Sequence, residues 1–168
     1  MSSSRHRRQP FRIGIGHDTH RLGEGGPVRL GGIDIPHDKH LIGHSDADVL
    51  LHAITDAILG AAGLGDIGDM FPDTDEVNRG RDSADMLRRA AEAVAQAGYG
   101  IGNLDCIVFA ERPKLGPVKR QIRDRIGAIL GLEPEQVGVK AKTGERLGAV
   151  GNEEAIMAQC VALIIAVP

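Results

Sequence analysis

The sequence predicts an α+β fold, in which a mixed sheet of four to five strands carries helices on one face and a small β-hairpin beside it. Strand-like and helix-like apolar patterns alternate along the chain, which favours packed layers of both kinds. No Gly-rich strand-to-helix phosphate motif is present, so a doubly wound nucleotide-binding fold is disfavoured. We expect residues 1–10 to form a disordered basic arm and residues 11–168 to form one domain.

The first predicted strand, Phe11–Gly16, has apolar residues at every second position. If the strand continues, Asp18 and His20 project to one face and His17 and Thr19 to the other. Short β-branched runs on either side of a Gly-Gly pair predict the hairpin. The remaining predicted strands are the hairpin arms Val28–Leu30 and Ile33–Ile35, then Asn103–Ala110, Val137–Ala141 and Ala155–Val167.

Apolar residues spaced three and four apart predict three helices. The first is expected to begin at Ser45, with Asp48 completing a capping box, and to end at Gly63. The other two are expected to run from a cap at Ser83 through Ala97 and from Pro117 to Leu130.

The composition excludes several classes of partner. Aromatic residues make up only 2% of the chain and the formal net charge is −3, so a nucleic-acid surface is disfavoured. The longest apolar run, Val161–Val167, is too short to cross a membrane. Cys106 and Cys160 lie inside apolar runs, as buried thiols of a reducing compartment do, and the N-terminus lacks the apolar stretch of a signal peptide. We therefore expect a cytoplasmic protein.

Asp18, His20 and His52 are candidate metal ligands, because a strand face and a helix could bring all three to one ion. Three protein ligands with an open fourth position are typical of a catalytic zinc site. Asp48 and Asp56 lie one helical turn on either side of His52 and are expected to accept from its other ring nitrogen. Exposed turn residues beside a helix-edge histidine, or metal-free acid–base catalysis by the same groups, are the alternatives.

His44 and Ser45 are a candidate phosphate site, because the expected helix start would add free backbone N–H groups to an imidazole and a hydroxyl. A Ser45 that only caps the helix is the alternative. His37 and His40 are expected to be solvated.

Two loops after predicted strands are further candidates. In KAKTGE, Lys142 and Thr143 could hold phosphate oxygens, and Glu145 suits a hard cation such as Mg²⁺. In AERPKL, Pro113 and Lys114 could support a nucleotide base or phosphate. The alternative for both is an ordinary solvated loop.

Taken together, these motifs resemble the 2-C-methyl-D-erythritol 2,4-cyclodiphosphate synthase family. The resemblance is carried by RIGIGHDTH, GHSDADVLLHAITDAILGAAGLGDIGDMFPDTD, DSADMLRRA, AERPKL and VKAKTGERLG, and it covers nearly the whole chain after residue 10. It implies a homotrimer whose sheets face the three-fold axis and whose active sites lie at subunit interfaces.

The resemblance also implies a role for each candidate. Asp18, His20 and His52 would bind zinc, and Glu145 would bind a second cation, Mg²⁺ or Mn²⁺. His44 and Thr143 would be catalytic and would hold phosphate together with Ser45 and Lys142. The resemblance further implies a methylerythritol pocket lined by Asp66, Ile67, Gly68 and Asp73. It also implies a cytidine-binding loop that ends at Gly116 and serves a neighbouring subunit; its substrate-binding residues would be Ala110, Pro113, Lys114 and Leu115.

The reaction implied is an intramolecular phosphoryl transfer that releases CMP, which needs no protein nucleophile. Three positions depart from the family pattern: Lys142 adds a positive charge, His17 replaces an aromatic residue, and Asn152 replaces an arginine. From Asn152 we expect weak binding of isoprenoid diphosphates at the trimer axis. A metal-dependent phosphohydrolase and a non-catalytic nucleotide-binding module are the rival interpretations.

Overall fold

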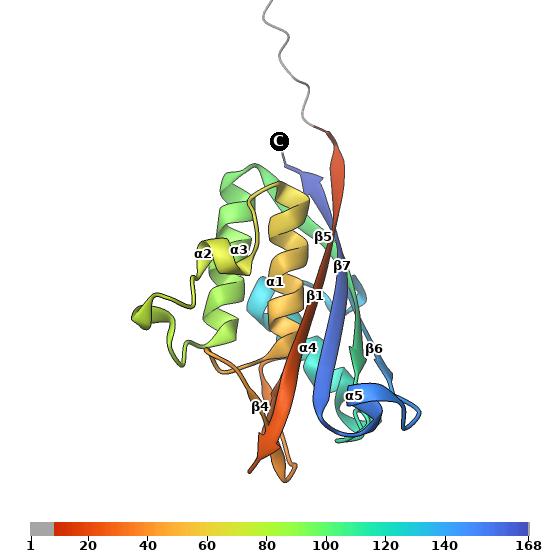
Figure 1. The fold of residues 1–168 in the computed structure, drawn as a ribbon. Coiled ribbons are helices and arrows are strands. Elements are labelled where there is room, and N and C mark those ends of the chain that lie inside the picture. Colours follow the sequence, from red (N-terminus) through yellow and green to blue (C-terminus); the bar gives the residue numbers. More distant parts are fainter. Residues whose placement is uncertain (1–8, 168) are drawn as a thin grey trace, which may run out of the picture.

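A computed structural model describes residues 9–167 and has an α+β architecture (Figure 1). The five-stranded sheet has the order β4-β1-β7-β5-β6; β5 and β6 are parallel, and the other neighbours are antiparallel. Residues 1–8 of the expected N-terminal arm lie outside the described part of the chain. The strands are β1 (Phe11–Glu24), β2 (Val28–Leu30), β3 (Ile33–Ile35), β4 (Lys39–Ile42), β5 (Tyr99–Phe109), β6 (Val137–Lys142) and β7 (Ala155–Ala166), with β2 and β3 forming the separate hairpin.

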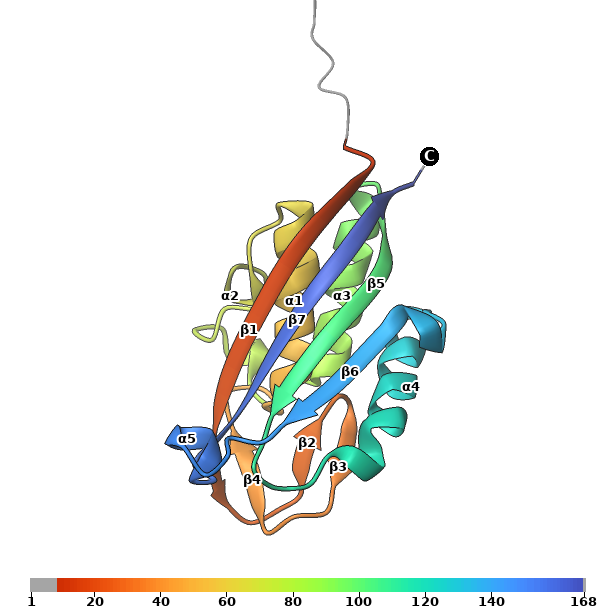
Figure 2. The same cartoon turned by 90° about the vertical axis from the view of Figure 1, so that its right-hand side faces the viewer.

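The longer helices cover one face of the sheet and leave the other face open (Figures 1 and 2). The predicted mixed sheet, the one-sided helices and the hairpin are thus confirmed. Every helix in residues 9–167 is too short or too polar to span a bilayer. The α-helices are α1 (Val49–Ala62), α2 (Ile67–Met70), α3 (Ser83–Gln96), α4 (Lys119–Leu130) and α5 (Gly148–Gly151), and the 3₁₀ turns are η1 (Glu76–Asn78), η2 (Gly116–Val118) and η3 (Pro134–Gln136).

Helix α1 is the centre of the core. It packs on β1 and β7 with one side and on α3 with another, so residues all around it are buried. Its close approach to β1 depends on the strand glycines Gly14 and Gly16, where a side chain would collide with the helix backbone. Because the core contains few aromatic residues, small aliphatic side chains fill this space.

The cap of α1 is Asp48, so the predicted cap at Ser45 is wrong. Asp48 is fully buried, and its carboxylate accepts from the Leu51 N–H at 3.1 Å and from the hairpin N–H groups of Gly31 at 2.9 Å and Gly32 at 2.7 Å. Since a buried carboxylate needs donors, the helix end and the hairpin turn together satisfy Asp48. A single side chain therefore ties the β2–β3 turn to the start of α1.

Four other expectations need correction. Residues 39–42, for which no strand is predicted, form edge strand β4 on the last residues of β1. His40 is indeed exposed there, whereas the His37 side chain is only 10% exposed. The cap of α3 is Asp82, one residue before Ser83, and the helix expected from Pro117 begins as the 3₁₀ turn η2 before α4.

The open face of the sheet carries exposed apolar side chains on β1 and β7 near the two chain ends. In the register of β1 with β7, Phe11 faces Ile165, Ile13 faces Leu163 and Ile15 faces Val161. Five of these six side chains are large exposed hydrophobics. Farther along, His17 faces Gln159, so the face becomes polar. We call the six apolar residues the open apolar face.

Candidate functional site

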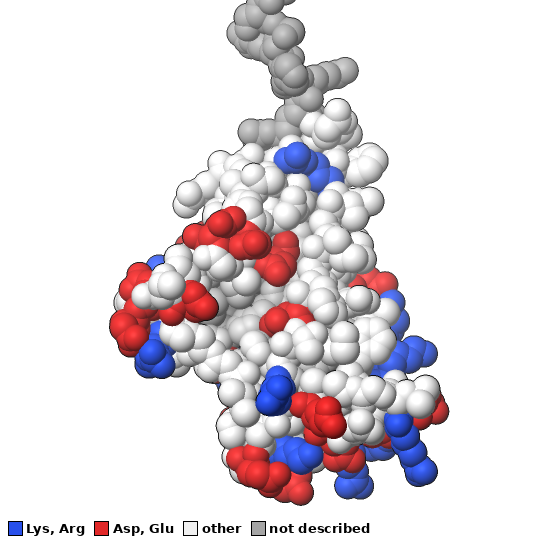
Figure 3. Space-filling view, viewed as in Figure 1, with Lys and Arg blue, Asp and Glu red and all other residues white. Residues whose placement is uncertain are grey.

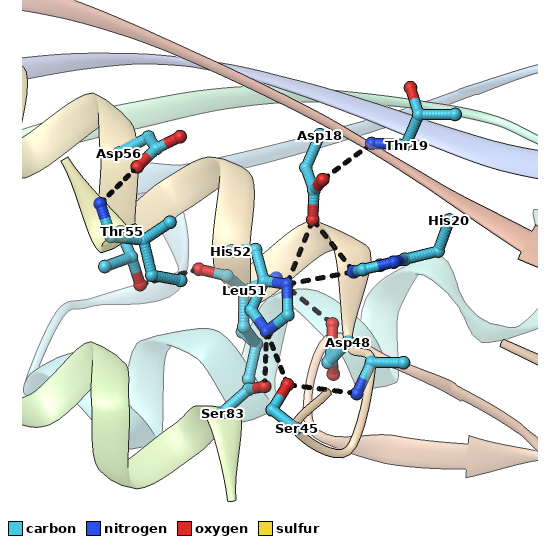
Figure 4. Close-up of polar contacts among 12 residues, drawn as sticks. Asp18, Thr19, His20, Ser45, Asp48, Leu51, His52, Thr55, Asp56 and Ser83 are labelled. Carbon is cyan, nitrogen blue, oxygen red and sulfur yellow. Dashed lines mark hydrogen bonds and ion pairs between the residues drawn. The ribbon is translucent and has the colours of Figure 1, made fainter. Parts of the chain in front are cut away.

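Asp18 and His20 on β1 meet His52 on α1 (Figure 4). Asp18 Oδ2 lies 2.9 Å from His52 Nδ1 and 3.1 Å from His20 Nε2, and the two ring nitrogens are 3.1 Å apart. One ligand atom from each residue falls within a 4.8 Å cluster. The period-two geometry of β1 points Asp18 and His20 toward the helix, and α1 presents His52 opposite them. The three residues can therefore hold a divalent metal ion.

The charge state of Asp18 suits that role. Burial raises the pKa of this carboxyl. Hydrogen bonds and electrostatic attraction to His20 and His52 outweigh burial and hold the pKa well below its usual range. A carboxylate that stays ionised beside two imidazoles is a ligand set typical of zinc and similar cations.

The far side of His52 is held by hydroxyl groups. Its Nε2 lies 2.8 Å from Ser83 Oγ and 3.0 Å from Ser45 Oγ. The expectation that Asp48 and Asp56 accept from this nitrogen is wrong. Asp48 is bound to the hairpin turn, and Asp56 accepts from the Ile67 N–H at 2.8 Å, which ties α1 to α2. Burial raises the pKa of Asp56 even though this hydrogen bond opposes the shift.

A cavity of about 400 Å³ opens beside the ligand group, which we call the metal-side cavity. Acidic side chains surround a hollow on this face, near α2 and the loop after it (Figure 3). The lining includes Asp18, Asp56 and Asp73 but no Lys or Arg from the described chain. The predicted residues that line it are Asp18, His20, His44, Ser45, His52, Ile67, Gly68 and Asp73; Asp66 caps α2 at its edge.

His44 lines this cavity. Its Nε2 is buried and has no hydrogen-bond partner among residues 9–167, which leaves this nitrogen unsatisfied beside the cavity. The helix start expected at Ser45, on which the backbone part of the phosphate-site prediction depends, is not there, and the phosphate site itself stays a prediction. Helix α1 begins at Val49, four residues after Ser45, and its cap is Asp48.

A second cavity of about 320 Å³, the lysine cavity, lies between the loop after β5 and the end of β6. Its lining includes Lys114, Lys119 and Lys142 and no carboxylate from the described chain. Ala110, Leu115 and Thr143, also predicted, line it too. Pro113 lies in the same loop, and Glu145 accepts from the Thr143 hydroxyl at 2.8 Å. The two cavities share no lining residue within the chain.

Three residues that position these groups were not predicted. The sequence predicts only a helix cap for Ser83 and no role for Asp46, whereas Ser83 contacts His52 Nε2 and Asp46 accepts from Ser83. Glu111 accepts from the Gly144 N–H at 3.2 Å and the Arg146 N–H at 3.4 Å, and so orients the Thr143–Glu145 loop. The position of Glu111 just after a buried strand was an available signal.

The fold and site define an α+β protein with a carboxylate–histidine–histidine group that could hold a metal ion beside one cavity, and with a second, lysine-lined cavity elsewhere on the chain. A sequence model of the YgbB family matches residues 11–165, and the chain belongs to this family.

Its relatives include the curated 2-C-methyl-D-erythritol 2,4-cyclodiphosphate synthase of Gemmatimonas aurantiaca, which is 54% identical over 157 residues, 94% of this chain and 95% of that protein. Among solved structures, the CDP complex of IspF from Plasmodium falciparum matches with a TM-score of 0.84 at 34% identity, over 96% of this chain and 100% of that one. The bifunctional IspDF of Campylobacter jejuni matches with a TM-score of 0.89 at 39% identity, over 93% of this chain but only 42% of that longer one.

Proposed function

We propose that this chain is a cyclodiphosphate synthase, which converts 4-diphosphocytidyl-2-C-methyl-D-erythritol 2-phosphate to 2-C-methyl-D-erythritol 2,4-cyclodiphosphate and CMP, in non-mevalonate isoprenoid precursor synthesis. The observation that carries the proposal is the Asp18–His20–His52 group beside the metal-side cavity. Relatives that carry this name match over nearly the full chain. A cytoplasmic location, expected from the buried free cysteines, belongs to the same proposal.

In the reaction, an oxygen of the 2-phosphate forms a bond to the β-phosphorus of the CDP group. The bond from that phosphorus to the bridging oxygen breaks, and CMP leaves with the electron pair. The phosphate is its own nucleophile, so the protein contributes by orientation and charge stabilisation, and orientation alone can lower the barrier by about 7–11 kcal/mol in favourable cases.

Zinc at Asp18, His20 and His52, and Mg²⁺ or Mn²⁺ at Glu145, would neutralise phosphate charge. This fits the metal-side cavity, whose lining residues include three carboxylates and no Lys or Arg from the described chain, so that it would otherwise repel a diphosphate. The His44 Nε2 donates to a phosphate oxygen, and the Ser45 hydroxyl steadies it. Lys142 and Thr143 hold the diphosphate from the lysine cavity.

The active protein is a homotrimer packed through the open apolar face, with the sheets toward the three-fold axis. Exposed Ile13 and Ile15 on adjacent positions of one strand face would be unfavourable in water but favourable against another copy. The separation of the two cavities within one chain supports sites at subunit interfaces, where the metal-side cavity of one subunit meets the lysine cavity of the next.

The test is phosphorus NMR of the reaction of the zinc- and magnesium-loaded protein with the CDP-linked 2-phosphate substrate. We expect one cyclic diphosphate and one CMP per substrate consumed. Linear phosphate products would identify a phosphohydrolase instead, and nucleotide binding without turnover would identify a binding module.

A further inference from the structure

Two hydroxyl groups, those of Ser45 and Ser83, lie behind the His52 ring (Figure 4). His52 Nδ1 faces Asp18 and His20, and Nε2 points away from them toward the Ser83 hydroxyl at 2.8 Å. An imidazole nitrogen that binds a metal ion carries no proton, so the other nitrogen carries one and needs an acceptor. The acceptor for Nε2–H must therefore be a hydroxyl oxygen.

The Ser83 hydroxyl is oriented to be that acceptor. Its own proton is donated to Asp46 Oδ1 in a short hydrogen bond, and the Ser83 backbone N–H donates to Asp46 Oδ2 at 3.1 Å. Because a carboxylate only accepts, the direction of the hydroxyl proton is settled. The lone pairs of Ser83 Oγ are thus left for His52 Nε2–H. Ser83 is fully buried, so water does not compete.

Asp46 is itself held in place. The chain turns sharply after it, at Ala47, whose φ of 59° lies in the left-handed region that costs a residue with a side chain about 1 kcal/mol. The Asp48 N–H donates back to Asp46 Oδ1 at 3.3 Å, and Arg29 Nε lies 3.7 Å from Oδ2. The hairpin, the turn and α3 therefore converge on one carboxylate.

We propose that Ser83 is a positioning residue of the metal centre, with Asp46 fixing its hydroxyl so that it accepts from His52 Nε2–H and presents Nδ1 to the ion. The proposal rests on the proposed function only for the identity of the ion as zinc. Partners of this kind behind a metal-bound histidine typically change metal affinity 10–100-fold.

The same geometry assigns a different task to Ser45. Its oxygen is 3.0 Å from Nε2 and accepts from the Ala47 N–H at 3.2 Å. Since Ser83 already accepts the Nε2 proton, the hydroxyl hydrogen of Ser45 is free to point into the metal-side cavity, which Ser45 lines. The Ser83 hydroxyl thus orients a metal ligand, whereas the Ser45 hydroxyl is free to bind a ligand in the metal-side cavity.

The experiment measures zinc affinity without substrate, by competition with a chromophoric chelator, for Ser83→Ala, Asp46→Asn and two controls. We expect roughly a 10–100-fold loss of affinity for Ser83→Ala and a smaller loss for Asp46→Asn. The control Asp34→Asn removes the other acidic partner of Arg29, at 3.1 Å, without touching Ser83. It should leave affinity within about two-fold, as should Ser45→Ala, which should instead lower turnover.

Thermal unfolding separates positioning from folding. For Ser83→Ala, we expect the Tm of the metal-free protein to fall, because a buried hydroxyl with two hydrogen bonds is lost, and the zinc-induced rise in Tm to be smaller than in the wild type. A Co²⁺-loaded protein adds a visible absorption spectrum, which should change with Ser83→Ala and not with Asp34→Asn.

Equal zinc affinity in wild type and Ser83→Ala would overturn the proposal. The proposal would also fail if Asp34→Asn lost as much zinc affinity as Asp46→Asn, or if Ser45→Ala lost as much as Ser83→Ala. Failure of the proposed function is distinguishable. A wild type that forms no cyclic product while Ser83→Ala still loses zinc affinity refutes the function and leaves the positioning role intact.

Discussion

The backbone of Gly16 in β1 lies so close to the Ala53 carbonyl of α1 that a Cβ atom on Gly16 would fall 1.9 Å from that oxygen. Asp18 lies two residues beyond Gly16, and His52 directly precedes Ala53. This backbone contact therefore sets the distance between the two elements that supply the metal ligands.

Replacing Gly16 with alanine should push β1 and α1 apart. The obstructing atoms belong to backbone, so we expect a loss of about 3 kcal/mol in the free energy of unfolding, at the upper end of overpacking effects. Zinc affinity should fall as well, because Asp18 moves away from His52. Urea unfolding and a zinc titration measure the two effects.

Gly60→Ala is the matched control on α1. Gly60 is exposed, and nothing lies within 4 Å of a Cβ placed on it. Here alanine should stabilise by about 0.5–1 kcal/mol through its higher helix propensity. A Gly16→Ala protein as stable as the wild type would contradict the close packing described here.

Subunit mixing tests whether each site is built from two chains. His52→Ala damages the metal-side cavity and Thr143→Ala damages the lysine cavity, so each variant alone should be inactive. In trimers refolded from an equal mixture, about one quarter of the interface sites combine two intact halves, and activity should return in that proportion. If no mixture regains activity, both halves belong to the same chain.

A charge on the open apolar face should break the proposed homotrimer. Ile15 is 71% exposed in the isolated chain, and Ile15→Lys would place an ammonium group against a neighbouring copy. We expect monomers in analytical ultracentrifugation and loss of turnover. Val77→Lys is the control, since Val77 is 72% exposed but lies on η1 away from the sheet, and it should stay trimeric.

Asp85 should make a small contribution to stability at neutral pH that disappears in acid. The Arg81 guanidinium donates to Asp85 at 2.9 Å and lowers the pKa of that carboxyl below its ordinary 3.8, with Arg89 adding to the effect. A lowered carboxyl pKa stabilises the fold above the unfolded value, and this stabilisation is lost as pH falls through the folded value.

Because the Asp85 side chain is 40% exposed, solvent screening limits the effect to about 0.5 kcal/mol. Urea unfolding of wild type and Asp85→Asn between about pH 6 and pH 2 should show a difference that vanishes at the acid end. Glu92→Gln, an exposed change on the same helix, is the control. A difference that grows toward low pH would reverse the sign and refute the pairing.

The elements that sequence reasoning located are those with a strong apolar period. Helix α1, the hairpin and the three long strands each bury one or more faces, and burial is what a hydrophobic pattern records. Strand β4 was missed because its four residues are held by main-chain pairing with β1, which does not depend on side-chain type. The predicted cap of α1 is wrong because the Asp48 carboxylate binds the hairpin N–H groups of Gly31 and Gly32 as well as the helix N–H of Leu51, and the hairpin contacts are not local in sequence.

The metal ligands were predictable because strand alternation and helix position are local properties. Their supporting groups were not. Ser83 is 31 residues from His52 in sequence, and its hydroxyl reaches Nε2 only because α3 packs against α1. Helical spacing suggests Asp48 and Asp56 as partners of His52. In the folded chain, however, both carboxylates accept from backbone N–H groups that are distant in sequence.

The first and last strands along the chain, β1 and β7, are neighbours in the sheet, and Phe11 lies opposite Ile165. The two ends of the domain therefore emerge side by side from the same end of the molecule (Figure 1). A short linker could join them, and a circular permutant opened in the exposed loop near Thr74 should keep the β1–β7 pairing and the metal ligands. For the same reason, another domain could be fused at either end without disturbing the metal-side cavity.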